Sequence, residues 1–278
     1  MCKNKDTPLT GATVNGASCG DGAVSVTPYP CSLYLPFLRF ASQQINQTYI
    51  ERNKVIMDNK RFSGRRPPKD CWHADLLHGA QYSSFAELPL FSQSTQIPDK
   101  VVAFNKVTPF CDGNQWLHFF VDDCRIEPVW ENPEQYLPCV QHFSGIISPD
   151  LSIYRDLPIP WQLFNTYRNR ALSYWFSSHG VPVIPNIRWS DERSYSFCFD
   201  GIEPNGVVCV SSHGVLSNSE DRRYFSNGLD EMMTRLAPSA VLVYGPMPPD
   251  IFHKYRGGGT RFVHFESDVQ RAHKRGQE

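Results

Sequence analysis

The chain has 278 residues and a formal net charge of −1, with 41% hydrophobic and 20% charged residues. These values are ordinary for a globular protein of one large or two small domains, and they exclude a strongly basic field over the whole molecule. Because no apolar run approaches the roughly 20 residues of a membrane span and no apolar stretch follows the N-terminus, we expect a soluble cytoplasmic protein with no membrane partner.

The nine cysteines are odd in number, are scattered along the chain and form no CxxC pair. This pattern does not match the ligand spacing of structural zinc sites. A protein that is not exported also stays in a reducing compartment. We therefore expect no disulfide and no metal site built mainly on cysteine.

Residues 1–95 have an irregular pattern. Turn signals occur at Asn15-Gly16 and Asp21-Gly22, and one helix is expected within residues 36–57. The basic segment from Lys60 to Lys69 is either a contact for phosphates or a solvated loop. We expect residues 1–95 to form an irregular N-terminal extension that packs on a main domain of residues 96–278.

From about residue 97, short apolar runs alternate with amphipathic stretches. This alternation predicts parallel strands with helical crossovers, in a (β/α) barrel or a barrel-like parallel sheet. A doubly wound open sheet is the alternative, although no GxGxxG follows any strand. Helices are expected over residues 130–141, 159–179 and 219–236. The predicted strands are Val101–Phe104, Leu117–Val121, Gly145–Ile147, Val181–Ile187, Val207–Val210, Ala240–Tyr244 and Arg261–Phe265.

Acidic and polar residues follow most of these runs. In parallel α/β folds the loops at the carboxyl ends of the strands converge, so these side chains are expected to face one mouth. Asp122 and Asp150 are the candidate catalytic pair, because two neighbouring strands deliver them together. The other candidates at the strand ends are Asp123, Asn186, Trp189, Ser212, His213, Tyr244 and Glu266.

Each candidate also has a structural interpretation. Asp123 and Asp268 suit helix caps. Ser212 and His213 are adjacent on a strand and point to opposite faces, and no GxSxG is present, so the pattern disfavours a serine hydrolase. Trp189 either stacks on a flat substrate or packs structurally.

The predicted helix after Asp150 adds two candidate binding residues. Asn165 and Arg168 are three positions apart, so they share a face of this helix. Arg168 either reaches a strand-end carboxylate or a substrate anion, or lies on the surface.

An ordered series of short motifs resembles a known family. The series is Phe120-Val121-Asp122-Asp123, Ile147 to Tyr154, Asn165-x-Tyr167-Arg168-x-Arg170, Val183 to Trp189 and Phe199-Asp200-Gly201. Over about residues 97–268 it is similar to domain-of-unknown-function family 4417 of bacteria and phages. The resemblance implies a bacterial, phage or mobile-element setting. It brings no established activity and no assigned catalytic residue.

Three functional hypotheses remain open from the residues. The first is an enzyme with a carboxylate-lined pocket that acts on the glycosidic bond of a nucleoside, nucleotide or nucleic acid. The second is a phosphoesterase that holds Mg²⁺ or Mn²⁺ on Asp122, Asp123, Asp150, His213 and Glu266. The third is a non-catalytic accessory protein that binds nucleic acid through the segment from Lys60 to Lys69. The oligomeric state stays open.

Overall fold

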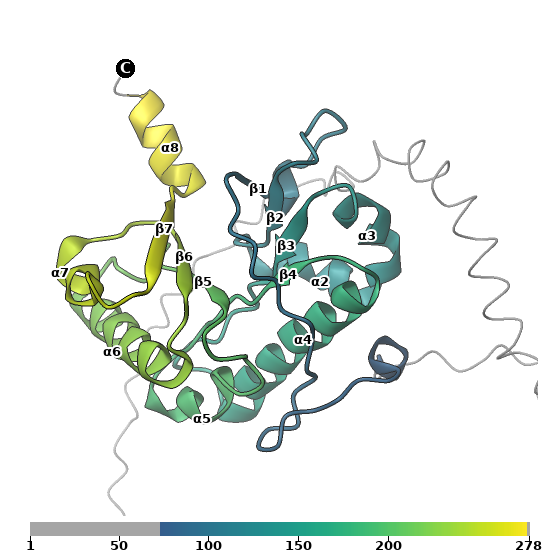
Figure 1. Ribbon diagram of the computed structural model, residues 1–278, viewed down its shortest axis with the longest axis horizontal. Coiled ribbons are helices and arrows are strands. Elements are labelled where there is room, and N and C mark those ends of the chain that lie inside the picture. The colour runs from purple at the N-terminus through teal and green to yellow at the C-terminus, as the bar shows by residue number, and fades with distance from the viewer. Residues whose placement is uncertain (1–72, 277–278) are drawn as a thin grey trace, which may run out of the picture.

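The computed structural model describes residues 73–276 as a mixed α/β protein (Figure 1). All seven predicted strands are present, and every pair in the two sheets is parallel. Their order is β1-β2-β3-β4 in the first sheet and β5-β6-β7 in the second. The strands are β1 (Val101–Ala103), β2 (Trp116–His118), β3 (Gly145–Ile147), β4 (Val183–Ile184), β5 (Val207–Ser211), β6 (Ala240–Tyr244) and β7 (Arg261–Phe265).

The two sheets meet where the chain leaves β4. Asn186 forms a parallel bridge with Cys209 of β5, and the Ile187 amide donates to the Cys209 carbonyl over 2.8 Å. The strand order therefore follows the chain order without a reversal. Because a doubly wound sheet requires a reversal, this alternative is wrong. No ladder joins β7 to β1 within residues 73–276, so the structure does not show a closed barrel.

Helices cover the strands on the outside (Figure 1). The helix predicted over residues 130–141 begins instead at Pro133, because Pro133 starts a new helix and disfavours the helical conformation at Asn132. A separate helix that was not predicted ends just before it, at Glu131. The two other long helices match the prediction closely. The helices are α2 (Asp123–Glu131), α3 (Pro133–Val140), α4 (Ile159–Ser178), α5 (Tyr195–Cys198), α6 (Ser219–Leu236), α7 (Pro249–Phe252) and α8 (Asp268–Arg275).

Four short 3₁₀ turns supplement these helices. They are η2 (Ala74–Leu77), η3 (Phe104–Lys106), η4 (Glu192–Ser194) and η5 (His253–Tyr255). Two apolar clusters hold the elements together. The larger cluster joins helices to both sheets. The smaller one gathers side chains from β1 to β6, namely Val101, Trp116, Ile147, Ile184, Val207, Cys209, Ala240 and Leu242. The two sheets therefore share one buried face.

Residues 73–95 are bound to the rest of the structure. The Ser94 amide donates to the Val183 carbonyl of β4 over 2.8 Å. The Ser83 hydroxyl donates to Asp200, and Leu88 is buried. The helix expected within residues 36–57 and the segment from Lys60 to Lys69 lie outside the described residues, and the domain boundary at residue 95 stays a prediction.

Two further observations concern the described part of the chain. Between residues 73 and 276, no helix combines the length and the apolar character that crossing a bilayer requires. The five cysteines of this range are free thiols, and the four others lie outside it: Cys2, Cys19, Cys31 and Cys71. The expected absence of disulfides therefore stays a prediction for the whole chain.

Candidate functional site

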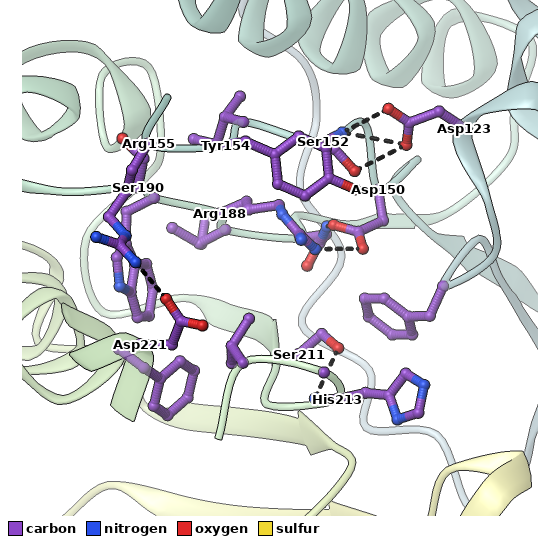
Figure 2. Close-up of a pocket in the computed structure, with 18 of the residues that line it drawn as sticks. Asp123, Asp150, Ser152, Tyr154, Arg155, Arg188, Ser190, Ser211, His213 and Asp221 are labelled. Carbon is purple, nitrogen blue, oxygen red and sulfur yellow. Dashed lines mark hydrogen bonds and ion pairs between the residues drawn. The ribbon is translucent and has the colours of Figure 1, made fainter. Parts of the chain in front are cut away.

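A cavity of about 740 Å³ opens at the carboxyl ends of the strands (Figure 2). Its walls come from the segments that follow β2, β3, β4 and β5 and from the first turns of α6. This position agrees with the expectation that strand-end residues converge. Six of the predicted site residues line the cavity, namely Asp122, Asp123, Asp150, Asn186, Trp189 and His213.

Asp150 is buried in the cavity wall and both of its carboxylate oxygens have partners. Asn186 Nδ2 donates to Oδ1 over 2.8 Å, and Arg188 Nη1 donates to Oδ2 over 2.7 Å. Burial alone would lower the pKa of Arg188, but the charge and the hydrogen bond of Asp150 raise it above its ordinary value. Arg188 is therefore a fixed cation on this wall.

Asp123 has a different environment from Asp150. The amide and the hydroxyl of Ser152 donate to its carboxylate over 3.2 Å and 3.0 Å. Burial raises the pKa of Asp123 against these two bonds, and the nearby charge of Asp150 raises it further. The neutral form of Asp123 thus persists to a higher pH than that of an ordinary aspartate.

Asp122 lies at the rim of the cavity and precedes α2. Its side chain is 82% exposed, and its carboxylate is 3.8 Å from Arg125 Nε. Its side chain caps no helix amide. Of the three carboxylates, that of Asp122 therefore makes the fewest contacts with other protein groups.

Aromatic side chains form part of the cavity wall. Tyr154 is 58% exposed and lies in the loop after Asp150. Trp189 donates from Nε1 to the Tyr224 carbonyl over 3.2 Å and stacks on Phe225 at 5.5 Å. A flat ligand can stack on such rings, although Trp189 is itself packed against α6.

An ion-pair cluster connects the loop after β3 to α6 at the cavity. Arg155 pairs with Glu220 and Asp221 over 3.0 Å and 2.5 Å. Its guanidinium also lies 4.4 Å from the centre of the Tyr224 ring. Figure 2 shows Arg155 and Asp221 bridging the cavity wall. Nη1 and Nη2 of Arg155 therefore each donate to a protein carboxylate.

The predicted binding residues of α4 lie behind the cavity. Asn165 Nδ2 donates to the Ser152 carbonyl over 2.6 Å, and Arg168 pairs with Glu127 of α2 over 2.7 Å. Asn169, one turn on, donates to Ser148 Oγ over 3.0 Å. Neither Asn165 nor Arg168 lines the cavity, because both side chains hold the neighbouring loop and helix.

The structure also shows where the remaining predicted site residues lie. His213 is exposed at the cavity rim. Ser212 is buried and donates to the Pro246 carbonyl over 2.5 Å. Tyr244 stacks on Phe120 at 4.6 Å but does not itself line the cavity. Glu266 pairs with Lys274 on the surface.

The five side chains that we considered as metal ligands are not gathered around one point. Glu266 lies outside the cavity. Among residues 73–276, no group of three or more His, Cys, Asp or Glu side chains is arranged to hold a metal ion. The donor set of the described residues therefore does not fit a Mg²⁺ or Mn²⁺ site.

Several cavity residues were not selected from the sequence, among them Ser152, Tyr154, Arg155 and Arg188. Arg188 had a usable signal, because it is two positions after Asn186 in an extended segment and so shares its face. Ser152, Tyr154 and Arg155 had none, since they lie in a loop without periodicity and their placement depends on contacts with α4 and α6.

Comparisons with known proteins agree with the resemblance. The family model of a domain of unknown function (DUF4417) matches residues 80–266. Gene 1 protein of Mycobacterium phage D29 is 36% identical over 167 residues, which cover 59% of this chain and 62% of that protein. Gene 1 protein of Mycobacterium phage L5 is 38% identical over 168 residues, covering 59% of this chain and 73% of that protein. The chain thus spans less than two thirds of the D29 protein. No solved structure matches the chain.

Proposed function

The chain belongs to the DUF4417 family, and from this premise we propose that it is an enzyme that cleaves or exchanges the glycosidic bond of a nucleoside, nucleotide or nucleic acid. The observation that carries the proposal is that three aspartates of different environment line one cavity. Asp122 is exposed, Asp123 is desolvated and Asp150 is ion-paired. Carboxyl groups in such contrasting surroundings can divide acid and base roles between them.

The roles follow from the partners of each carboxyl group. Asp122 acts as the base that takes a proton from water, because its carboxylate is exposed and its ion pair with Arg125 is long, at 3.8 Å. Asp123 supplies a proton, since burial favours its neutral form. Asp150 holds Arg188, which lines the cavity.

In this reaction the water oxygen bonds to the anomeric carbon while the bond to the base nitrogen breaks. The electron pair of that bond passes to the base, Asp123 protonates the base, and Asp122 receives the proton of the water. Tyr154 stacks on the base. The cavity of about 740 Å³ is within the range of small-molecule sites, roughly 300–1,000 Å³.

We also infer that the seven strands form a barrel-like wall around this site. The strand order that follows the chain and the shared apolar face of the two sheets support this arrangement. The phage relatives support a phage or bacterial setting. The nucleotide or nucleic-acid partner is proposed from the cavity alone.

The test is a screen of the purified chain on nucleosides, nucleotides and oligonucleotides, with release of free base measured by chromatography. Asp122→Asn and Asp123→Asn keep the shape of the side chain and remove its acid–base function, so each is expected to lower turnover by about 10²–10⁴-fold. Asp99→Asn, at an exposed position outside the cavity, is the matched control. Full activity of both cavity variants would refute the assignment.

The phosphoesterase hypothesis has weaker support, because the described residues offer no metal-holding group. The same screen with and without Mg²⁺ or Mn²⁺ tests it, since activity that requires the metal would favour this hypothesis. The accessory-protein hypothesis rests on the segment from Lys60 to Lys69, and a salt titration of nucleic-acid binding tests it.

A further inference from the structure

Arg188 presents unused hydrogen-bond donors to the cavity. Its Nη1 donates to Asp150, whereas its Nε and Nη2 donate to no protein acceptor among residues 73–276. Neither nitrogen is a buried atom without a partner, so both are accessible to solvent. The ion pair with Asp150 fixes the plane of the guanidinium and leaves its Nε–Nη2 edge free for a ligand.

From this edge we infer that the cavity recognises a guanine-type base, through two adjacent hydrogen bonds from Arg188 to the O6 and N7 atoms. An arginine fork matches two neighbouring acceptors, and guanine presents such a pair on its O6/N7 edge. Adenine presents one acceptor and one donor there, so it fails to match. This inference rests on the proposed function and names the base on which it acts.

The charge of the cavity favours a base over a free anion. Four aspartates line the cavity against two arginines, namely Asp122, Asp123, Asp150 and Asp221 against Arg155 and Arg188. Both arginines are already paired with carboxylates. A phosphate would therefore meet net negative charge, whereas a neutral base brings acceptor atoms without this repulsion.

The aromatic wall favours a purine over a pyrimidine. Cytosine also has two adjacent acceptors, O2 and N3, and so matches the arginine fork in part. The larger double ring of guanine gains more contact with the exposed ring of Tyr154, which lines the same cavity. Tyr154 and Arg188 line the same cavity.

A series of nucleosides tests the inference by calorimetric titration of the whole chain. Inosine keeps O6 and N7 and is expected to bind as tightly as guanosine. Adenosine, which lacks O6, and 7-deazaguanosine, which lacks N7, are each expected to bind roughly 5- to 150-fold more weakly. Equal affinity for 7-deazaguanosine, or affinity for cytidine or inorganic phosphate equal to that for guanosine, would overturn the inference.

A variant at Arg188 gives an independent measurement. Arg188→Lys keeps a cation beside Asp150 but loses the fork, so guanosine is expected to bind only as well as 7-deazaguanosine. Arg235→Lys is the matched control, because Arg235 pairs with Glu231 on α6 and neither residue lines the cavity. Thermal melting checks that both variants fold. If Arg188→Lys does not fold, the nucleoside series on the unaltered chain decides whether the cavity recognises guanine.

The two proposals can fail separately. If guanosine binds with the expected pattern but no base is released, the recognition of guanine stands and the glycosidic reaction is wrong. If bases are released equally from all nucleosides, the reaction stands and the recognition of guanine is wrong. If no nucleoside binds, the recognition of guanine is wrong, and the screen on nucleotides and oligonucleotides decides the reaction.

Discussion

Arg188 Nη1 lies 2.7 Å from Asp150 Oδ2, although the two residues are 38 positions apart in the chain. The pair joins the segment after β3 to the segment after β4, at the boundary between the two sheets. Asn186 donates to the other oxygen of the same carboxylate, so a single side chain fixes both neighbours. The wall of the cavity therefore depends on Asp150.

The first prediction concerns this dependence. Asp150→Ala leaves Arg188 and Asn186 without their acceptor, so the free energy of unfolding is expected to fall by about 2–3 kcal/mol. The value is below that of a fully buried pair, since the Arg188 side chain is 26% exposed. Urea denaturation measures it. Asp99→Ala, at an exposed position, should change stability by less than about 0.5 kcal/mol, and an equal loss in both variants would contradict the prediction.

The second prediction concerns Gly228 in the middle of α6. A helical glycine normally costs about 1 kcal/mol relative to alanine, so Gly228→Ala would ordinarily stabilise the protein. Here an added Cβ would lie 2.1 Å from Trp189 Nε1. Because Trp189 is held against α6, we expect Gly228→Ala to lower the free energy of unfolding by about 1–3 kcal/mol.

Chemical denaturation of Gly228→Ala measures the sign directly. The control is Asn227→Ala, an exposed neighbour on the same helix, which is expected to be neutral or slightly stabilising. A gain of stability in Gly228→Ala would show that Trp189 moves away at little cost.

The strands and long helices of this fold were predictable because their sequence patterns are local. Buried parallel strands read as short apolar runs, and Val207–Val210 and Ala240–Tyr244 match β5 and β6 within one residue. The break between α2 and α3 was missed, although Pro133 is a local signal for it. A closed barrel would need pairing between β7 and β1, which are distant in the chain, and no local pattern encodes such pairing.

The candidate site was predictable only where it follows strands directly. Asp122 and Asp150 line the cavity because parallel strands end at one edge of the sheet. Arg168 was misplaced, because the helical face that it shares with Asn165 packs against the protein and not the cavity. Tyr154 lies in a loop whose path depends on contacts with α4, which the sequence pattern does not reveal.

The third prediction concerns His118, which is fully buried between the rings of Phe120 and Tyr244. Burial lowers its pKa to about 3, so the imidazole is neutral in the folded protein near neutral pH. In the unfolded chain its pKa returns to the ordinary value of about 6.5. The stability contribution is therefore complete above about pH 6.5 and is lost as the pH falls toward 3, by up to about 1.4 kcal/mol per pH unit.

Urea denaturation of the wild type and of His118→Gln across pH 4 to 7 measures this contribution. Glutamine stays neutral and still accepts a hydrogen bond from the Phe120 amide, as His118 Nδ1 does. The free energy of unfolding of the wild type, minus that of His118→Gln, is expected to fall as the pH falls. His213→Gln, at an exposed position, controls for a general effect of removing a histidine, and a difference that is constant with pH would refute the prediction.

The last prediction concerns Asp123. Burial raises the pKa of this carboxyl above its ordinary value, so between the two values the folded protein binds more protons than the unfolded chain. The stability contribution of Asp123 is therefore complete at low pH and is lost as the pH rises through the raised pKa. An ordinary paired aspartate has the opposite pH dependence, because its pKa is lowered in the folded protein. Asp123→Asn removes this dependence and keeps an oxygen that accepts from Ser152. In urea denaturation, the variant is expected to gain stability relative to the wild type between about pH 3.5 and pH 7, and a relative loss over that range would show that the ionised carboxylate is the form that the fold favours.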